Sequence, residues 1–363
     1  MRNMKIAELA VPVVILNSRN DILNEIKPRN PIVLGLEGTA HTFGAGIVQG
    51  EKILADQRAQ YVPPIGGIHP RESAIYISKN LGIVLHRALE EAQIRFDELD
   101  AIAFSIGPGL GACLRTVATA ARALALLLEC PLIGVNHCIG HVELGKLTTG
   151  AKDPLTLYVS GGNTQIITYD SGRYRVIGET LDIAVGNALD TFARDIGLPH
   201  PGGPHIEKLA TKSRLKEPIE LPYTVKGMSL SFSGLVTAAN RLVTDPQRCY
   251  SKEEICNAFQ EYAFSMLAEV TERALVCTNK KEIVLTGGVA ANARLKEMIQ
   301  LIAEEHDGVT MLPVHPKLAL DNGVMIAWTG VLMYRAGLTL TVEDSCVQPR
   351  QRVEDVSAIW VTV

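Results

Sequence analysis

Three segments of the chain share one pattern: an apolar, β-branched run, a turn containing glycine, and then a second strand or a helix. The runs lead into Gly38-Thr39, into residues 161–164 and into Gly287-Gly288. Thr39 and Thr164 lie 125 positions apart (164 − 39), about one domain length, so the first two segments predict one lobe used twice. The third run precedes an amphipathic pattern at 292–302, which predicts a helix.

The length of the chain favours two lobes, because 363 residues exceed the size at which a single hydrophobic core stops growing. Segment 71–91 has helical periodicity with one polar side, and segment 111–128 is rich in Ala and Leu all round, which predicts a buried helix. Strands alternating with helices predict an α/β protein with helices packed outside the sheets. We expect an N-terminal extension of unassigned role at 1–30, a first lobe at 31–150 to which 329–363 return, and a second lobe at 151–328 with an insertion at 202–235 that reaches over the cleft.

Charge and cysteine usage limit the classes of protein to which this chain can belong. The formal net charge is −4, whereas a chain that binds nucleic acid alone is usually basic, so any RNA contact requires a local patch or a partner protein. The seven cysteines are scattered without a C-x-x-C pair, which indicates a reducing cytoplasm. The apolar run 6–16 is about half the length of a membrane span and contains Glu8 and Pro12, so we expect no membrane association.

Glycines directly after a strand let backbone amides approach a phosphate, although a single such turn is also an ordinary tight turn. Three of them at domain spacing resemble the actin, sugar-kinase and Hsp70 superfamily, in which two turns face the phosphates and the third touches the adenosine. The resemblance implies a two-lobed fold with duplicated lobes. Those ATPases usually carry Asp in the first two turns, where this chain has Glu37 and Ser160, which argues against simple ATP hydrolysis.

Two carboxylates are candidates for holding a ribose. Asp190 follows the sequence Gly-Asn-Ala-Leu, and Glu207 lies one turn into a helix that Gly202-Gly203-Pro204 is expected to begin. A carboxylate at the edge of a nucleotide site can accept hydrogen bonds from both ribose hydroxyls. The spacing alone is also typical of a solvated helix face, and that interpretation is the commoner of the two.

The pattern His137-x-x-x-His141 places two imidazoles on one helix face, close enough to share a metal ion such as zinc, iron or nickel. Two surface histidines would give the same pattern. A zinc protease needs Glu directly after the first histidine, and Cys138 stands there. Asp321 precedes an apolar helix expected at 324–333, where it would serve either as the helix N-cap or as a third metal ligand, and the spacing leaves both open.

Five stretches closely resemble the universal tRNA threonylcarbamoyladenosine transferase family: residues 134–143, 158–164, 231–235, 287–292 and 321–323. The resemblance runs from about residue 32 to residue 360. Segments 160–164 and 34–39 are similar to the archaeal and eukaryotic branch, a subunit of the KEOPS complex, whereas the bacterial branch usually has His where Asn163 stands. In one departure, Tyr76 and Ile77 occupy the place of the family's usual histidine pair.

The resemblance implies roles for particular residues. It implies one divalent metal ion, iron or zinc, held by His137, His141 and Asp321, which are also the catalytic positions, with Tyr158 as a fourth position near the metal. It implies substrate and nucleotide binding by Tyr158, Val159, Ser160, Gly161, Gly162, Asp190, Gly203, Glu207 and Asn292. For Asp190 and Glu207 it favours the ribose contact over the solvated helix face.

The resemblance also implies an activity and partners. Members move the threonylcarbamoyl group of threonylcarbamoyl-AMP to N6 of the adenosine just 3′ of the anticodon, in tRNAs that read codons beginning with A. The archaeal and eukaryotic members work with a small protein kinase or ATPase subunit, which we expect here as a separate polypeptide, together with other KEOPS subunits. Two alternatives stay open: a sugar or acetate kinase, which needs a catalytic Asp, and a non-catalytic scaffold, which would be expected to lose the metal residues.

Overall fold

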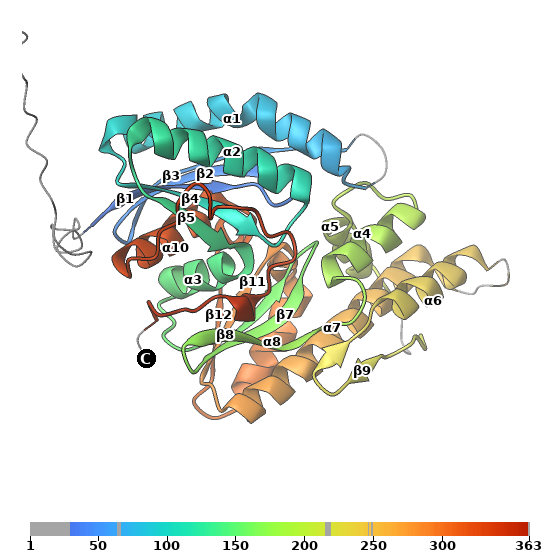
Figure 1. Ribbon diagram of the computed structural model, residues 1–363. Helices are drawn as coiled ribbons and strands as arrows, with labels where there is room; N and C mark the ends of the chain where they lie inside the picture. The colour runs from blue at the N-terminus through green and yellow to red at the C-terminus, as the bar shows by residue number, and fades with distance from the viewer. Residues whose placement is uncertain (1–29, 64–66, 215–218, 246, 248–249, 362–363) are drawn as a thin grey trace, which may run out of the picture.

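The computed structural model describes residues 30–63, 67–214, 219–245, 247 and 250–361. The N-terminal extension expected at 1–30 therefore lies outside the described residues, except for Asn30. The described chain forms two mixed β-sheets with helices packed on them (Figure 1). The first sheet comprises β1 (Ile32–Glu37), β2 (Thr42–Gln49), β3 (Lys52–Gln60), β4 (Ala101–Gly107) and β5 (Leu132–Asn136). The second comprises β6 (Leu155–Val159), β7 (Thr164–Asp170), β8 (Arg173–Thr180), β9 (Val225–Lys226), β10 (Ser229–Leu230), β11 (Glu282–Thr286) and β12 (Thr310–Pro313).

The two sheets repeat one topology. The first has the order β3-β2-β1-β4-β5, and the second contains the equivalent order β8-β7-β6-β11-β12, with β10 and β9 added beside β8. In each sheet the first three strands pair antiparallel, and the first strand then pairs parallel with a later strand. A parallel partner requires a crossover connection, and helices supply it in both lobes. The predicted α/β fold with duplicated lobes is confirmed.

Helices cover both faces of the first sheet. On one face lie α1 (Pro70–Ala92) and α2 (Gly111–Leu128), and on the other lies α10 (Gly323–Arg335), which packs on β1 and β2 (Figure 1). The connecting helix α3 (His137–Thr149) contacts α10 and also β11 of the second sheet. The second lobe carries α4 (Val185–Asp195), α5 (Gly202–Ala210), α6 (Ser233–Thr244), α7 (Lys252–Thr278), α8 (Ala293–Glu305) and α9 (Pro316–Ala319).

The α2 helix differs from the expectation that it would be buried all round. Its buried residues lie on one face, while Leu126 and Leu127 are 65% and 78% exposed. By length and composition α2 could cross a membrane, but it packs on β4 and α1 in the manner of a core helix. The prediction failed because an apolar composition does not reveal how many sides of a helix have tertiary partners.

The backbone of α10 lies directly on the backbones of β1 and β2. A Cβ atom on Gly323 would come within 2.0 Å of the Gly46 nitrogen, and one on Gly35 within 2.1 Å of the Ala327 nitrogen, so only glycine permits this approach. The return to the first lobe therefore begins at Gly323, ahead of the expected residue 329. The last described residues lie instead against the second lobe, where Ser357 pairs with Arg173 of β8.

Segment 202–235 is integrated into the second lobe. It contains α5, which packs on α4 and α7, and the short strands β9 and β10, which extend the second sheet from β8. Its predicted role as an insertion over the cleft stays a prediction.

Candidate metal centre and nucleotide site

The N-terminus of α3 fixes the two histidines of the predicted metal set. Asn136 ends β5 and caps α3, because its Oδ1 accepts hydrogen bonds from the backbone nitrogens of Cys138 and Ile139 at 3.0 and 3.2 Å. His137 is the first residue of the helix, and His141 follows one turn later on the same face. Both side chains are buried, which excludes the interpretation that they are ordinary surface histidines.

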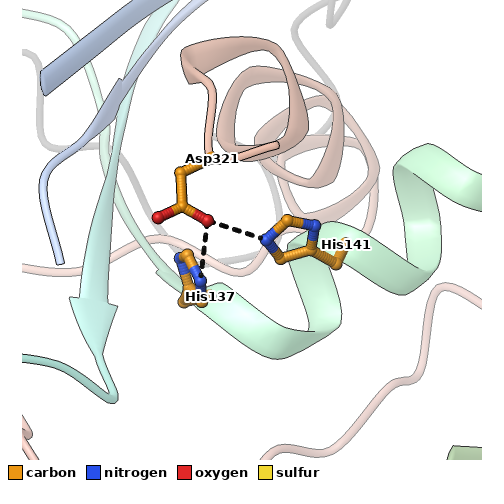
Figure 2. Close-up of side chains that lie close together, drawn as sticks. All are labelled: His137, His141 and Asp321. Carbon is orange, nitrogen blue, oxygen red and sulfur yellow. Dashed lines mark hydrogen bonds and ion pairs between the residues drawn. The ribbon is translucent and has the colours of Figure 1, made fainter. Parts of the chain in front are cut away.

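Asp321 does not cap α10. The N-cap is Asn322, whose side chain accepts a hydrogen bond from the Met325 nitrogen at 2.8 Å. The Asp321 carboxylate is thus available to the histidines: its Oδ1 lies 3.3 Å from His141 Nε2 and 3.6 Å from His137 Nε2 (Figure 2). The N-cap alternative is wrong, and the structure brings Asp321 to the predicted metal set.

The three side chains form a set of donors that fits a divalent cation. One ligand atom from each of His137, His141 and Asp321 lies within 4.8 Å of the other two. The Tyr158 hydroxyl lies 3.1 Å from His137 Nε2, and its ring stacks on His141 with a centroid distance of 4.6 Å. Two imidazole nitrogens and one carboxylate oxygen are a donor set typical of zinc and non-haem iron.

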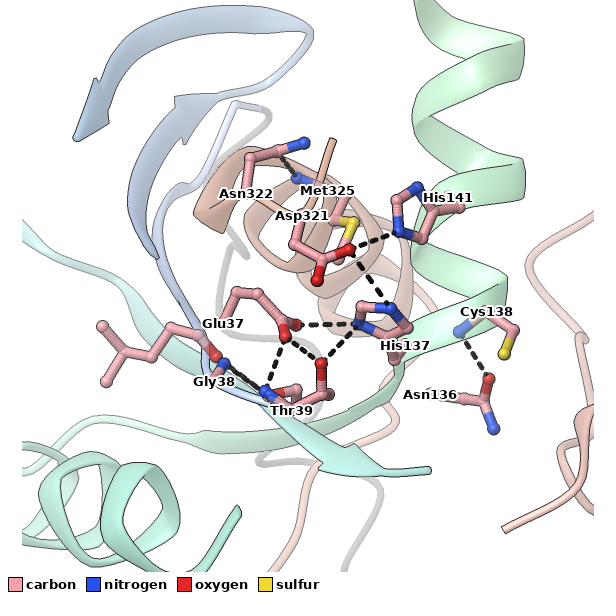
Figure 3. A network of polar contacts seen from close by, with 12 residues as sticks. Glu37, Gly38, Thr39, Asn136, His137, Cys138, His141, Asp321, Asn322 and Met325 are labelled. Atoms are coloured by element: carbon pink, nitrogen blue, oxygen red, sulfur yellow. Dashed lines mark hydrogen bonds and ion pairs between the residues drawn. The ribbon is translucent and has the colours of Figure 1, made fainter. Parts of the chain in front are cut away.

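Glu37 orients the first histidine from behind. Its Oε2 lies 3.1 Å from His137 Nδ1, and its Oε1 accepts hydrogen bonds from the Thr39 nitrogen and hydroxyl at 2.7 and 2.6 Å (Figure 3). A carboxylate on Nδ1 selects the tautomer that leaves Nε2 free for a metal. In the sequence Glu37 stands out only as a departure from Asp; the signal for its role is a carboxylate at the end of a fully apolar strand. His141 Nδ1, by contrast, has no hydrogen-bond partner within the described part of the chain.

The charges of this cluster depend on one another. Burial lowers the pKa of His137, but the carboxylates of Glu37 and Asp321 outweigh burial and raise it to about 9. Burial lowers the pKa of His141. Burial raises the pKa of Asp321, and His137 and His141 more than reverse that effect and hold it well below its ordinary value. A cation bound through His137 Nε2 therefore takes the place of a proton.

The predicted ribose carboxylates hold backbone nitrogens in the second lobe. Asp190 Oδ1 accepts from the Gly202 nitrogen at 2.6 Å, and Glu207 Oε1 accepts from the Ala293 nitrogen at 2.7 Å. Asn292, which precedes Ala293, caps α8, and its amide donates to Gln260 Oε1 at 3.0 Å. These contacts join α4 to the start of α5, α5 to the start of α8, and the cap of α8 to α7. The nucleotide-binding roles of Asp190, Glu207 and Asn292 stay predictions.

The two glycine–threonine turns differ in what surrounds them. At Gly161 and Gly162 an added Cβ atom would meet nothing within 4 Å, so this turn, which also contains Ser160 and follows Val159, borders open space. Gly203 is similarly uncrowded, with only Leu189 Cδ1 at 3.8 Å. In the first turn the amide nitrogens of Gly38 and Thr39 donate to Ser105 and Glu37 inside the lobe.

A second pair of histidines, which no sequence motif indicates, joins the two lobes. His41, in the β1–β2 turn, contacts His200, which follows α4, with ring centroids 6.2 Å apart at 75°. His200 Nδ1 lies 3.5 Å from Asp190 Oδ2. Burial lowers the pKa of His41, and the carboxylates of Asp321 and Asp190 partly oppose this. His41 thus lies between the metal set and a predicted ribose carboxylate, an arrangement that only the tertiary fold creates.

The positions of the family's histidine pair serve the first lobe's packing. Both residues lie in α1. The Ile77 side chain is fully buried in the core of the first lobe, and the Tyr76 and Tyr61 ring centroids are 5.8 Å apart. Neither belongs to the metal set.

Comparison with known proteins gives one consistent family. The family model for tRNA N6-adenosine threonylcarbamoyltransferase matches residues 52–328. A protein of that name from Thermococcus sibiricus is 53% identical over 329 residues, which cover 91% of this chain and 100% of the relative. A probable bifunctional tRNA threonylcarbamoyladenosine biosynthesis protein from Methanosphaera stadtmanae is 53% identical over 331 residues, and the chain spans only 61% of its length. Among solved structures, T. kodakarensis HypF aligns with a TM-score of 0.62 at 15% identity, covering 87% of this chain and 49% of HypF, which supports the fold alone.

Replacing either histidine should remove the metal. We expect His141→Ala and His137→Ala to lose bound metal, because each leaves too few donors for tight binding, while circular dichroism stays unchanged. The measurement is elemental analysis of the purified proteins. Unchanged metal content in both variants would contradict the assignment.

Glu37→Gln should weaken metal binding without removing a ligand. The amide cannot supply the charge that orients His137, so we expect the metal dissociation constant to rise roughly 10- to 100-fold, as measured by competition with a chelator. Glu305→Gln, the same charge change on an exposed part of α8, is the control. Equal affinity in Glu37→Gln and the control would show that Glu37 has no influence on the metal.

Proposed function

Because this chain belongs to the tRNA N6-adenosine threonylcarbamoyltransferase family, we propose that it transfers a threonylcarbamoyl group from threonylcarbamoyl-AMP to tRNA. The acceptor is N6 of the adenosine just 3′ of the anticodon in tRNAs that read codons beginning with A, and the product is N6-threonylcarbamoyladenosine. The observation that carries this proposal is the convergence beside Tyr158 of His137 and His141 from α3 with Asp321 from the distant loop before α10.

The metal proposed for this site is zinc or iron, held by His137, His141, Asp321 and Tyr158. When bound, it would act as a Lewis acid toward the carbamoyl donor. Glu37 holds His137 in the orientation that directs Nε2 to the metal. Burial raises the pKa of the Tyr158 hydroxyl well above its ordinary value.

The remaining residues act by position. N6 of adenine is a weak nucleophile because its lone pair is delocalised into the ring, so the two substrates must be held in reacting geometry. We assign the AMP portion to Tyr158, Val159, Ser160, Gly161 and Gly162, to Gly203 and Asn292, and its ribose to Asp190 and Glu207. As the bond from N6 to the carbamoyl carbon forms, the bond from that carbon to the phosphate oxygen breaks, AMP leaves, and the N6 proton passes to solvent.

We also propose that the chain works in the cytoplasm with partners of the KEOPS type, including a separate small kinase or ATPase subunit. The net charge of −4 supplies little of the phosphate neutralisation that tRNA binding requires. Relatives named as bifunctional are longer than this chain, which spans about three fifths of their length. A cluster of basic residues lies near the end of α5, at Lys208, Lys212 and Arg214.

The ribose assignment predicts discrimination against deoxynucleotides. ATP should bind more tightly than 2′-deoxy-ATP by about 1–3 kcal/mol, because a missing hydroxyl leaves a carboxylate oxygen unpaired. Isothermal titration calorimetry of the metal-loaded chain measures both affinities. Equal affinity would contradict the placement of Asp190 and Glu207.

The transfer reaction and its dependence on partners can be tested together. Single-turnover assays with threonylcarbamoyl-AMP and tRNA, at one salt concentration, should yield the modified nucleoside rapidly for the reconstituted complex and slowly for the isolated chain, because the partners carry most of the tRNA contact. His141→Ala in the complex is the control and should give no product. Equal tRNA affinity and rate with and without partners would refute the partner proposal, and no product from the complex would refute the transfer.

A further inference from the structure

Glu143 is a buried carboxylate on α3, two residues after His141, that the proposed reaction does not use. Both tryptophans of the chain donate hydrogen bonds to it: Trp328 Nε1 to its backbone oxygen at 3.1 Å, and Trp360 Nε1 to its Oε1 at 2.6 Å. The Tyr174 hydroxyl donates to the same Oε1 at 2.7 Å. One residue therefore receives donors from three separate elements.

Those elements include α10, the helix that directly follows the proposed metal ligand Asp321. Trp328 lies in α10, which begins two residues after Asp321, and Tyr174 lies in β8. The α3 and α10 helices pack closely on each other, and the hydrogen bond from Trp328 to the Glu143 backbone oxygen joins them. The distance between the two histidines and Asp321 depends on how α3 lies against α10. The Glu143 carboxylate, two residues after His141, fixes α3 through Tyr174 and Trp360.

The third donor, Trp360, lies at the end of residues 348–361, which we name the C-terminal strap. The strap starts on the first lobe, where the Gln348 nitrogen donates to the Ile106 oxygen at 2.8 Å. It crosses to the second lobe, where the Ala358 nitrogen donates to the oxygen of Gly172, the residue before β8, at 2.9 Å. The strap therefore joins the two lobes by its own backbone.

The strap also contacts α3 at two places that flank the metal histidines. At the start of the helix, the amide of the capping residue Asn136 donates to Gln351 Oε1 at 3.0 Å. Further along, Trp360 donates to Glu143. Between these points, Val353 and Ala358 pack in one small core with Cys138 and Tyr158.

A carboxylate is costly to bury unless donors meet its oxygens, whereas an apolar side chain would fill the same volume without that cost. Here Oε1 receives two donors, and Lys146 Nζ lies 3.7 Å from Oε2. Burial and the nearby Glu143 raise the pKa of Tyr174 well above its ordinary value, so its hydroxyl remains a donor. Hydrogen bonds have direction, so this arrangement fixes how α3 lies relative to its neighbours, which an apolar contact would not do.

We propose that Glu143 is a positioning residue of the metal centre: its carboxylate holds α3 against β8 and the C-terminal strap, so that docking of the strap and binding of the metal favour each other. The inference rests on the proposed metal site and does not depend on the transfer reaction. Coupling between two binding events is reciprocal. Weaker docking of the strap should therefore lower the metal affinity, and removal of the metal should weaken docking of the strap.

The test uses the full chain with Co²⁺, whose visible spectrum reports the geometry of its ligands. We expect Glu143→Gln and Trp360→Phe each to raise the Co²⁺ dissociation constant roughly 10-fold, the lower end of the effect of residues that support metal ligands, and to change the spectrum, because each frees α3 from the strap. The double variant should be no weaker than the weaker single variant, because both remove the same interaction. In the reciprocal measurement, Zn²⁺ should slow amide hydrogen exchange of residues 353–361 in the unaltered chain, and less so in Trp360→Phe.

Tyr169→Phe is the matched control, because it removes another hydrogen bond of the strap, from the Tyr169 hydroxyl to the Val361 oxygen, without touching Glu143. It should raise the Co²⁺ dissociation constant less than Trp360→Phe does, because the strap keeps its hydrogen bond to Glu143 of α3. Trp360→Phe keeps an aromatic ring at a half-buried position near the end of the chain, so it remains informative if Glu143→Gln does not fold. A lower melting temperature with unchanged Co²⁺ affinity and spectrum in Trp360→Phe would overturn the proposal. An unaltered chain that binds no Co²⁺ would refute the metal site itself.

Discussion

The arrangement of the centre depends on a single buried imidazole that two carboxylates must reach from opposite sides. His137 has Glu37 on Nδ1, and Asp321 and the Tyr158 hydroxyl near Nε2. Glu37 is the last residue of β1, and Tyr158 lies near the end of β6, the equivalent first strand of the second sheet. The carboxyl ends of the two equivalent strands therefore meet at the two nitrogens of one ring, which is where α/β proteins commonly place their sites.

Bringing Asp321 to this ring requires an unusually close contact between a helix and a sheet. The first turns of α10 lie against β1 and β2 so closely that side chains at Gly35, Gly46 or Gly323 would collide with backbone atoms. These glycines are therefore needed for the position of Asp321, the proposed metal ligand, and not for a turn. The Asn322 cap completes the arrangement, because it satisfies the start of α10 and leaves its neighbour free to face the histidines.

The sequence was sufficient for those features that depend on local pattern or on a repeated motif. The glycine–threonine turns predicted the duplicated lobes, and the periodic segments predicted α1 and α8 to within a few residues. Features that depend on tertiary partners were beyond it: the exposed face of α2, and the contact between His41 and His200 from different lobes. The choice between cap and ligand at Asp321 turned on a shift of one residue, and both neighbours are good caps, so local pattern could not decide it.

The balance of charge in the centre explains why its donors suit a divalent cation. Glu37 and Asp321 bring two negative charges into a buried region, and protonated His137 returns one positive charge, which leaves one net negative charge in a place where unpaired charge is costly. A monovalent cation that displaced the His137 proton would leave that balance unchanged. A divalent cation in the same exchange brings the formal sum to zero. The Glu37 carboxylate therefore has two effects on the site: it contributes a negative charge, and it orients the His137 ring.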